Sequence, residues 1–335
     1  MNEYKGIMVF AQNERGKIHK VSYELLGKAQ NLKEKTGEEI SCILLGPEGL
    51  GAKELIYRGA DKVYYIQDDN IFNEPEEMVY KENIIKLIKE KKPAICLFGA
   101  TNFGRSIAPR VAAALKCGLT ADCTGLDVDE DGSLIQIRPA FSENILAHIK
   151  SEQRPQMSTV RYKEFAEAKK DETRSGEIKI LKAKKDSDKM IKILKQLEQS
   201  EIDITEAEIV VAVGMGLKTK EDLKMVNELA DLLDGQVGAS RDFVEEGYID
   251  KSHQVGYSGN RVKPKLYVAL GISGAPQHIA GMKESDMIIA VNNDPSAPIF
   301  NIADYGIVAD LYDVVPVMIE KIKNQKGLKN LKNIS

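Results

Sequence analysis

The feature that most constrains the fold is a regular alternation of apolar runs with amphipathic segments, which occurs in two separate stretches of the chain. In the first stretch, continuous apolar runs typical of buried strands alternate with apolar residues at helical spacing. Such alternation indicates βαβ units and a parallel sheet. The expected strands are Gly6–Phe10, Ile40–Leu45, Lys62–Ile66 and Ala94–Gly99, and the expected helices are Val21–Lys35, Leu50–Arg58, Glu76–Lys91 and Arg105–Leu115.

The pattern changes between the two stretches. Residues Leu119–Tyr162 hold short β-like runs with a turn at Glu130–Ser133, which predicts a small antiparallel extension of the first domain. From about Phe165 to Glu206 the chain is densely charged, with one helical stretch at Lys189–Leu197. We interpret this charged stretch as a solvated connector between domains.

The alternation resumes at Ala207. The expected elements are the strands Ile209–Val213, Leu266–Leu270 and Met287–Val291 and the helices Glu221–Leu233 and Val314–Lys323. We therefore predict an α/β protein with an N-terminal Rossmann-like parallel sheet, which carries the antiparallel extension, and a C-terminal doubly wound parallel sheet. The expected bounds are 1–185 for the N-terminal domain, 186–206 for the connector, 207–325 for the C-terminal domain and 326–335 for a basic tail.

Composition narrows the class of function. The formal net charge of −4 gives no electrostatic basis for binding nucleic acid or an anionic membrane, and 6% aromatic content without Trp argues against a base-stacking surface. No apolar run reaches the roughly 18–20 residues of a membrane span, and the N-terminus lacks the plan of a signal peptide, so we expect a cytoplasmic protein without membrane insertion. None of the four cysteines forms a CxxC pair, which predicts neither a disulfide framework nor a metal site.

Polar and glycine-bearing turns follow each strand of the second stretch. They are Gly214–Gly216, Gly271–Ala275 and Asn292–Pro295. Ligands of parallel sheets bind outside the carboxyl ends of the strands, where glycine lets the backbone approach a phosphate and helix N-termini complement its charge. Each turn alone is equally explained as a tight connection, because neither glycine turn completes G-x-G-x-x-G and no Walker A sequence occurs.

Four further blocks, in order, make a more specific pattern. Gly238–Arg241 and Gln254–Gly259 are polar, glycine-rich and out of helical or strand register, so we expect loops folded over a ligand. Together with Leu266–Gly281 and Ala290–Leu311, they resemble the FAD-binding region of the electron transfer flavoprotein alpha subunit family. The resemblance extends more thinly to Gly104–Ala114, Leu119–Thr124, Arg138–Phe141 and Arg154–Arg161.

This resemblance implies one FAD in the C-terminal domain, tuned by three side chains. In the family, the residue matching Arg241 lies against the isoalloxazine ring, that matching His278 donates toward the C2 carbonyl, and that matching Ser258 sits near N5. Reduction places negative charge around N1 and the C2 carbonyl, so a cation or donor there favours the reduced flavin. For His278 we expect a partly protonated imidazole.

The remaining contacts are implied in the same way. Ser273, Gly274, Ala275 and Gln277 match residues at the ribityl and pyrophosphate portion, and Asn292, Asp310 and Leu311 match residues at the adenosine end. The full set of expected FAD contacts is Ser240, Arg241, Gln254, Val255, Gly256, Tyr257, Ser258, Gly271, Ser273, Gly274, Ala275, Pro276, Gln277, His278, Asn292, Asp310 and Leu311.

Several of these residues also have a simpler explanation. His278 suits the start of a helix, Arg241 a surface ion pair, and Asp310 a helix cap. The sequence also departs from the family, which often has Arg at the position of Met215 and commonly Thr at that of Ser258. Because Met cannot meet a phosphate, one phosphate contact must come from elsewhere or be lost.

The function implied by the resemblance is electron transfer by one subunit of a heterodimer. The chain would pair with a beta subunit and pass electrons to or from an acyl-CoA dehydrogenase or a related flavoenzyme. In the bifurcating kind of these proteins, NADH reduces a second FAD in the beta subunit, which sends one electron to ferredoxin or flavodoxin and the other to the alpha-subunit flavin. The sequence leaves open which kind this is, and the alternative is a non-redox NAD- or nucleotide-binding module on the same fold.

Overall fold

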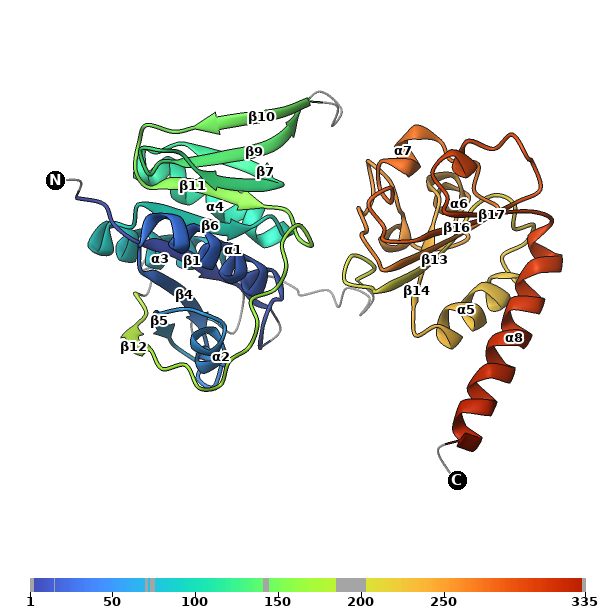
Figure 1. Ribbon diagram of the computed structural model, residues 1–335, viewed down its shortest axis with the longest axis horizontal. Helices are drawn as coiled ribbons and strands as arrows, with labels where there is room; N and C mark the ends of the chain where they lie inside the picture. Colours follow the sequence, from blue (N-terminus) through green and yellow to red (C-terminus); the bar gives the residue numbers. More distant parts are fainter. Residues whose placement is uncertain are drawn as a thin grey trace. The chain divides into compact units, whose positions relative to one another are not determined.

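The chain divides into two compact units, residues 1–192 and 193–335 (Figure 1). The computed structural model describes residues 3–14, 16–69, 72, 76–140, 145–184 and 203–332, with side chains up to residue 325. The expected helical stretch at Lys189–Leu197 lies outside these residues, as does most of the expected connector. Within the described ranges, no helix combines the length and apolar character needed to cross a bilayer.

The first unit is built on a seven-stranded sheet in which every pair of neighbours is parallel. Across the sheet the order is β12 (Glu177–Lys182), β5 (Lys62–Gln67), β4 (Ile40–Gly46), β1 (Ile7–Ala11), β6 (Ile95–Gly99), β11 (Gln156–Val160) and β7 (Leu119–Cys123). A short antiparallel hairpin follows β1 and consists of β2 (Asn13–Glu14) and β3 (Lys17–Ile18). The parallel sheet predicted for the N-terminal domain is confirmed.

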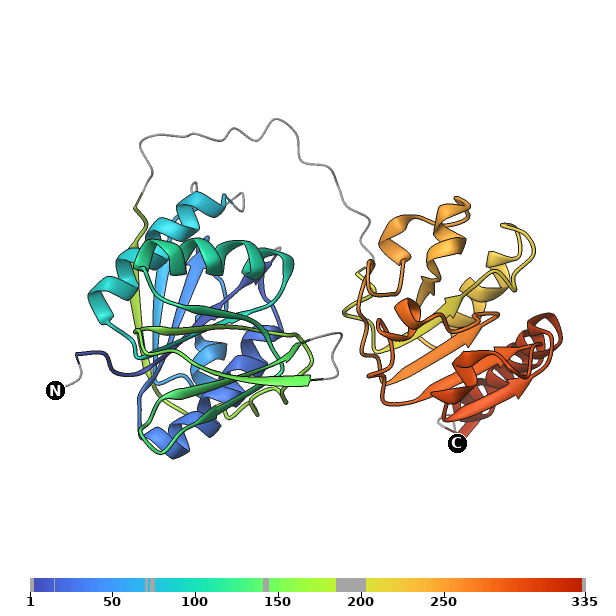
Figure 2. The same cartoon turned by 90° about the horizontal axis from the view of Figure 1, so that it is seen from above.

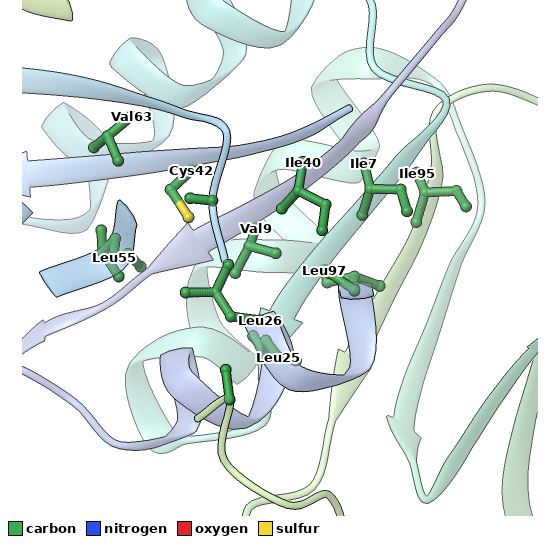
Figure 3. Packing of buried hydrophobic residues seen from close by; sticks show 14 of the residues in the cluster. Ile7, Val9, Leu25, Leu26, Ile40, Cys42, Leu55, Val63, Ile95 and Leu97 are labelled. Atoms are coloured by element: carbon green, nitrogen blue, oxygen red, sulfur yellow. The ribbon is translucent and has the colours of Figure 1, made fainter. Parts of the chain in front are cut away.

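Helices cover both faces of this sheet because its strands are apolar on both sides. Val9 belongs to a core with α1 (Val21–Thr36) and α2 (Ala52–Tyr57), and Phe10, the next residue, to a core with α3 (Glu77–Lys91) and α4 (Asn102–Leu115). Figure 3 shows Leu25 and Leu26 of α1 pointing toward the strands that carry Val9 and Leu97. Burying each such Leu contributes about 1.5–3 kcal/mol.

The helix ends follow from local sequence. The hydroxyl of Thr101 accepts a hydrogen bond from the backbone N–H of Gly104 at 3.0 Å and so caps the start of α4. At the end of α1, Gly37 adopts a left-handed conformation with φ of 69°, and its N–H donates to the carbonyl of Lys33. The end of α1 agrees with the expected bound to within one residue, whereas the Thr101 cap starts α4 at Asn102, three residues before the expected Arg105.

The predicted antiparallel extension is a three-stranded sheet, ordered β10 (Ile145–Lys150), β9 (Leu134–Ala140) and β8 (Gly125–Val128). However, β7 and β11, which we expected in this extension, pair in parallel with the main sheet. The polar residues of β11, including Gln156 and Ser158, are buried rather than solvent-facing. Their hydrogen bonds replace those with water, so polarity here does not mark an exposed face.

A buried glutamine joins the two sheets. The Gln136 amide nitrogen donates to the Met157 carbonyl and the Ser158 hydroxyl, both at 2.7 Å. Its amide oxygen accepts from the Thr120 hydroxyl, also at 2.7 Å. With both ends of the side chain satisfied, the network fixes the extension against β7 and β11.

Strand β12 lies within the charged stretch from about Phe165 to Glu206, so the interpretation of that stretch as a solvated connector is wrong for residues 177–182, which do fall within the expected bounds of the N-terminal domain. The strand pairs in parallel with β5 at the edge of the sheet. Its partner residue Lys62 lies 3.3 Å from Glu177, measured from Nζ to Oε2. Charged side chains suit an edge strand because they discourage pairing with other chains, and they hide the strand from a search for apolar runs.

The second unit holds a five-stranded parallel sheet with the order β14 (Gln236–Ala239), β13 (Ile209–Val213), β15 (Leu266–Leu270), β16 (Ile288–Asn292) and β17 (Tyr305–Val308). Its helices are α5 (Leu223–Leu232), α6 (Arg241–Glu245), α7 (Pro276–Ile279) and α8 (Leu311–Lys332), with 3₁₀ turns η1 (Lys251–His253) and η2 (Pro298–Asn301). Counted along the chain, the strand order is 2-1-3-4-5, which is a doubly wound arrangement.

Both faces of this sheet are buried as well. Val211 and Val213 pack in a core with α5 and α8, which lie side by side in Figures 1 and 2. Val210 and Ala212 face a second core, which includes Tyr267. The fold class predicted from the sequence is confirmed in both units.

Three elements of the second unit differ from the expectation. The block Gly238–Arg241 is the end of β14 and the start of α6 instead of a loop. Gly238 serves close packing, because a Cβ there would lie 3.0 Å from side-chain carbons of Val210 and Val255. Strand β17 was not expected, and α8 continues to Lys332, through part of the expected tail.

Candidate functional site

A cavity of about 620 Å³ opens at the carboxyl ends of β13 and β15. The direction of chain progression across the sheet reverses between these two strands, and such a switch point is where open parallel sheets bind ligands. The cavity volume lies within the range of about 300–1,000 Å³ found for small-molecule and cofactor sites. The two glycine turns predicted as a ligand edge both line it.

The floor of the cavity is a backbone contact between these turns. The N–H of Gly216 donates to the carbonyl of Gly271 at 3.1 Å. A Cβ on Gly216 would lie 2.6 Å from the Gly271 Cα, and a Cβ on Gly271 would lie 2.7 Å from the Gly216 Cα. Gly271 also has a φ of +59°, so both the close approach and the backbone conformation require glycine there.

The segment 254–259 forms one wall. The N–H of Val255 donates to the carbonyl of Ala239 at 2.9 Å, which ties the segment to the end of β14. The N–H of Tyr257 donates to the carbonyl of Gln277 at 2.7 Å, which ties it to the start of α7. The segment is therefore held between two elements of the cavity, while the Tyr257 side chain stays exposed.

Arg241 is the first residue of α6 and lines the cavity beside Ser240. Its Nε lies 2.7 Å from Glu245 Oε1, one helical turn away, and the Arg241 side chain is 64% exposed. The hydrogen bond with the Glu245 carboxylate raises the pKa of Arg241 above its usual range. The surface ion pair considered for this residue therefore exists, and it holds the guanidinium at the cavity.

Ser258 lies in the same wall of the cavity as buried Gln254. The Gln254 amide nitrogen donates to the Ser258 hydroxyl oxygen at 3.2 Å. Both residues line the cavity. The Ser258 hydroxyl accepts this bond and keeps its own proton available for another acceptor.

His278 contributes a buried imidazole to the cavity lining and is only 6% exposed. Burial lowers its pKa to about 4, although the backbone of Val255 acts in the opposite direction. The expected partly protonated imidazole is therefore wrong, because desolvation favours the neutral ring at pH 7. Nε2 lies 2.9 Å from the hydroxyl oxygen of Tyr267, whereas Nδ1 has no hydrogen-bond partner among the described residues.

The part of the cavity lined by Asn292 and Asp310 is polar. The Asn292 amide nitrogen donates to the carbonyl of Ile272 at 2.9 Å, which fixes the turn after β15 against the end of β16. Asp310 Oδ1 accepts from the backbone N–H of Tyr312 at 3.0 Å, so Asp310 does cap α8. Its other oxygen lies 3.9 Å from Nζ of Lys218 and still lines the cavity.

All the predicted contact residues line the cavity except Gly274 and Pro276. Gly274 has a φ of +89°, and a Cβ there would lie 2.4 Å from the backbone nitrogen of Ile299. It therefore serves packing of η2 against the turn. Pro276 is the first residue of α7, where its fixed φ suits a helix start.

Sequence reasoning missed several lining residues, and the most important is Lys218. Its Nζ lies 4.8 Å from the centroid of the Tyr312 ring, at the mouth of the cavity. Position alone could have indicated it, because it follows the first glycine turn by two residues. Outside the predicted contact set, Asp242, Glu245, Val291 and Ala297 were missed as well, whereas Gly214, Met215, Gly216, Ile272, Asn293 and Asp294 lie in the turns that were predicted as a ligand edge.

The cysteines all belong to the first unit, whereas the cavity belongs to the second. Cys42, Cys96 and Cys123 are buried in the first unit, and Cys117 is half-buried. Burial raises the pKa of Cys123 to about 11 and those of Cys42 and Cys96 further, so these groups are thiols at pH 7. They behave as small apolar side chains of the core.

Comparison with known proteins identifies the site's family. Residues 7–186 match the electron transfer flavoprotein domain, and residues 203–283 match the electron transfer flavoprotein FAD-binding domain. The electron transfer flavoprotein subunit alpha of Thermoanaerobacterium thermosaccharolyticum is 48% identical over 334 residues, which cover 97% of this chain and 100% of that protein. This chain belongs to the electron transfer flavoprotein alpha subunit family. Its function is electron transfer and its cofactor is FAD.

Other members of the electron transfer flavoprotein alpha subunit family align over nearly the same length. The subunit alpha of Megasphaera elsdenii is 46% identical over 97% of this chain and 98% of its own. The lactate dehydrogenase (NAD(+),ferredoxin) subunit LctC of Acetobacterium woodii is 42% identical over 99% of this chain and 80% of its own. Membership in this family favours the flavin over the non-redox nucleotide module that we considered.

Proposed function

We propose that this chain is the alpha subunit of a heterodimeric electron transfer flavoprotein and holds one FAD in the cavity of its second unit. The observation that carries the proposal is the cavity itself, at the switch point between β13 and β15. It lies in the unit that contains the FAD-binding match, and its lining includes Arg241, Ser258 and His278.

The lining fits such a cofactor in three respects. Gly216 and Gly271 leave a backbone floor without side chains, which suits close approach of a pyrophosphate. His278 Nδ1 is a buried nitrogen without a partner in the described residues, which suits a polar atom of a ligand. Asp310 keeps one carboxylate oxygen that makes no backbone bond, which suits a ribose hydroxyl.

FAD supplies the ability to accept and release electrons singly or in pairs. The chain's own residues set how readily the bound ring takes up negative charge. The Arg241 guanidinium provides a permanent cation at one side of the cavity, and neutral His278 provides a hydrogen bond without charge. Glu245 works against them, because its carboxylate lines the same cavity and pairs with Arg241.

Lys218 supplies the phosphate contact that Met215 cannot make. Its side chain is 71% exposed, and the contact of its Nζ with Asp310, at 3.9 Å, is long. The side chain is therefore free to turn toward a pyrophosphate above the Gly214–Gly216 turn. Lys218→Gln is expected to raise the FAD dissociation constant about two- to fivefold and to reduce its salt dependence. Lys220→Gln is the control, because Lys220 is exposed and does not line the cavity.

The partners are a beta subunit and an acyl-CoA dehydrogenase or related flavoenzyme. The first unit presents exposed apolar side chains, Ile145 and Leu146, on edge strand β10, which supports a role in pairing. Light scattering of the separately purified chain is expected to show aggregation that ends on addition of the beta subunit. A separately purified chain that is a stable monomer and does not bind the beta subunit would contradict obligate pairing.

We further propose the bifurcating kind of chemistry, with NADH as donor and ferredoxin as one acceptor. Support comes from the relative whose name joins NAD(+) and ferredoxin in one enzyme. Stopped-flow mixing of the two-subunit protein with NADH tests it directly. We expect rapid bleaching of the flavin absorbance. We expect ferredoxin to be reduced only when a dehydrogenase is present to accept the other electron. Absence of any reaction with NADH would overturn this part and leave FAD binding untouched.

A further inference from the structure

Tyr267 is an unusual core residue of the second unit. It is the second residue of β15 and has no exposed surface, yet its side chain carries a polar hydroxyl. That hydroxyl oxygen lies 2.9 Å from Nε2 of His278 on α7. The two rings meet edge-on, with centroids 6.2 Å apart and planes at 62°.

This contact determines where the imidazole carries its proton. If the Tyr267 hydroxyl donates to Nε2, that nitrogen is the acceptor and the proton of the neutral ring is on Nδ1. In the reverse arrangement, Nε2–H donates to Tyr267, whose own proton then needs another acceptor. Among the described residues, no other group makes a hydrogen bond with the Tyr267 hydroxyl. The reverse arrangement thus leaves a fully buried O–H unpaired, which is unfavourable because a buried polar group loses its hydrogen bonds to water without replacing them.

The remaining imidazole nitrogen is the one that lacks a partner. His278 Nδ1 is buried and has no acceptor in hydrogen-bonding geometry within the described part of the chain. His278 also lines the cavity of about 620 Å³. A protonated Nδ1 is therefore a donor in the cavity lining that makes no hydrogen bond of regular geometry within the described residues, although the nearby backbone of Val255 raises the pKa of the ring.

We propose that Tyr267 is a positioning residue that holds His278 as the Nδ1–H tautomer and so presents this N–H to an acceptor atom of the ligand in the cavity. The proposal rests on the proposed function in taking that ligand to be FAD. The acceptor is then a carbonyl oxygen or an unprotonated nitrogen of the flavin ring. Tyr267 itself does not line the cavity but is buried in the core with Val210 and Ala212.

The neutral state of the ring agrees with this assignment. Burial lowers the pKa of His278 and raises that of Tyr267, so both groups are uncharged near pH 7. A neutral imidazole has only one N–H, and its location decides whether Nδ1 donates or accepts. Without Tyr267, nothing at Nε2 selects between the two tautomers, and the proton is held on Nδ1 only by the weaker influence of the Val255 backbone.

The test is the tautomer itself, measured by ¹⁵N NMR on the two-subunit protein in which this chain alone is labelled at histidine. In the wild type, His278 is expected to show a protonated Nδ1 and an unprotonated Nε2, with its signals assigned by their loss in His278→Gln. In Tyr267→Phe, a mixture of both tautomers is expected. Tyr80→Phe is the matched control, because it removes a buried tyrosine hydroxyl from the first unit and should leave His278 unchanged.

A second readout links the tautomer to the ligand. FAD titration of Tyr267→Phe in the two-subunit protein is expected to give a dissociation constant about fivefold higher than that of the wild type or Tyr80→Phe. Wild-type protein with the proton on Nε2 would overturn the proposal, and this result stands even if Tyr267→Phe does not fold. Equal FAD binding and equal tautomers in Tyr267→Phe and wild type would also overturn it. Failure of the wild type to bind FAD would instead refute the proposed function and leave the tautomer assignment standing.

Discussion

Gly216 and Gly271 touch through their backbones, with the N–H of the first bonded to the carbonyl of the second at 3.1 Å. They belong to turns after two adjacent strands, β13 and β15, and the contact brings the two strand ends together under the cavity. No side chain fits between them, because a Cβ on either residue would approach the other Cα to less than a normal contact distance.

Gly271→Ala is therefore expected to remove FAD binding and to destabilise the second unit by more than the strain of a left-handed alanine, which is about 1–2 kcal/mol. FAD content after purification and urea unfolding measure the two effects. Gly247→Ala is the control, because Gly247 also has a positive φ, of +74°, but nothing lies near its missing Cβ. Equal effects of both variants would show that the backbone contact is unimportant.

Charges at the cavity are expected to shift the FAD potential in opposite directions. Arg241→Ala removes a cation and should lower the midpoint potential, while Glu245→Gln removes the paired carboxylate and should raise it. Because both groups are exposed, solvent screening limits each shift to the order of tens of millivolts. Redox titration of the two variants checks the signs. Shifts of the same sign, or none, would contradict the placement of FAD beside Arg241.

The burial of His278 predicts a particular pH dependence. Its pKa is lowered from 6.5 to about 4 in the folded chain, so the unfolded chain binds a proton first as the pH falls. The stability that comes from burying a neutral His278 is fully present above pH 6.5 and decreases toward pH 4. The free energy of unfolding is expected to fall by about 2 kcal/mol between pH 7 and pH 5. The free energy of unfolding of the second unit at these two pH values measures it. His278→Gln should lack this part of the pH dependence, and an equal slope in both proteins would contradict the burial argument.

The first unit offers a test of its buried amide network. Gln136→Leu keeps the size of the side chain but leaves the Thr120 hydroxyl, the Ser158 hydroxyl and the Met157 carbonyl without their partner. We expect a loss of about 2–4 kcal/mol, measured by urea unfolding. Gln153→Leu, at an exposed position after β10, should stay within about 0.5 kcal/mol of the wild type. A mild effect of Gln136→Leu would mean that water replaces the network.

Apolar periodicity predicted most elements because the strands of both sheets are buried on two faces. Leu266–Leu270 is an example, since the expected and observed bounds of β15 coincide. The edge strands β12 and β17 were not predicted, because their side chains are exposed and such strands need no continuous apolar run. Segment Gly238–Arg241 was misjudged because its glycine serves packing across the sheet, which local sequence does not reveal.

The sequence predicted the turns of the candidate site and the residue pattern of its family. It did not predict the contacts that depend on tertiary packing. Tyr267 looked like one more apolar strand residue, and only the position of α7 brings His278 within 2.9 Å of its hydroxyl. Likewise, the desolvation that keeps His278 neutral depends on how deeply it is buried, so the ordinary pKa of histidine led to the wrong charge state.

The central claim is that FAD occupies the cavity between the carboxyl ends of β13 and β15. A crystal structure of the two-subunit protein purified with FAD tests it most directly. We predict cofactor density over the Gly216–Gly271 contact, with Nδ1 of His278 about 3 Å from an acceptor atom of the flavin ring. An empty cavity in a structure that holds FAD elsewhere on this chain would contradict the account.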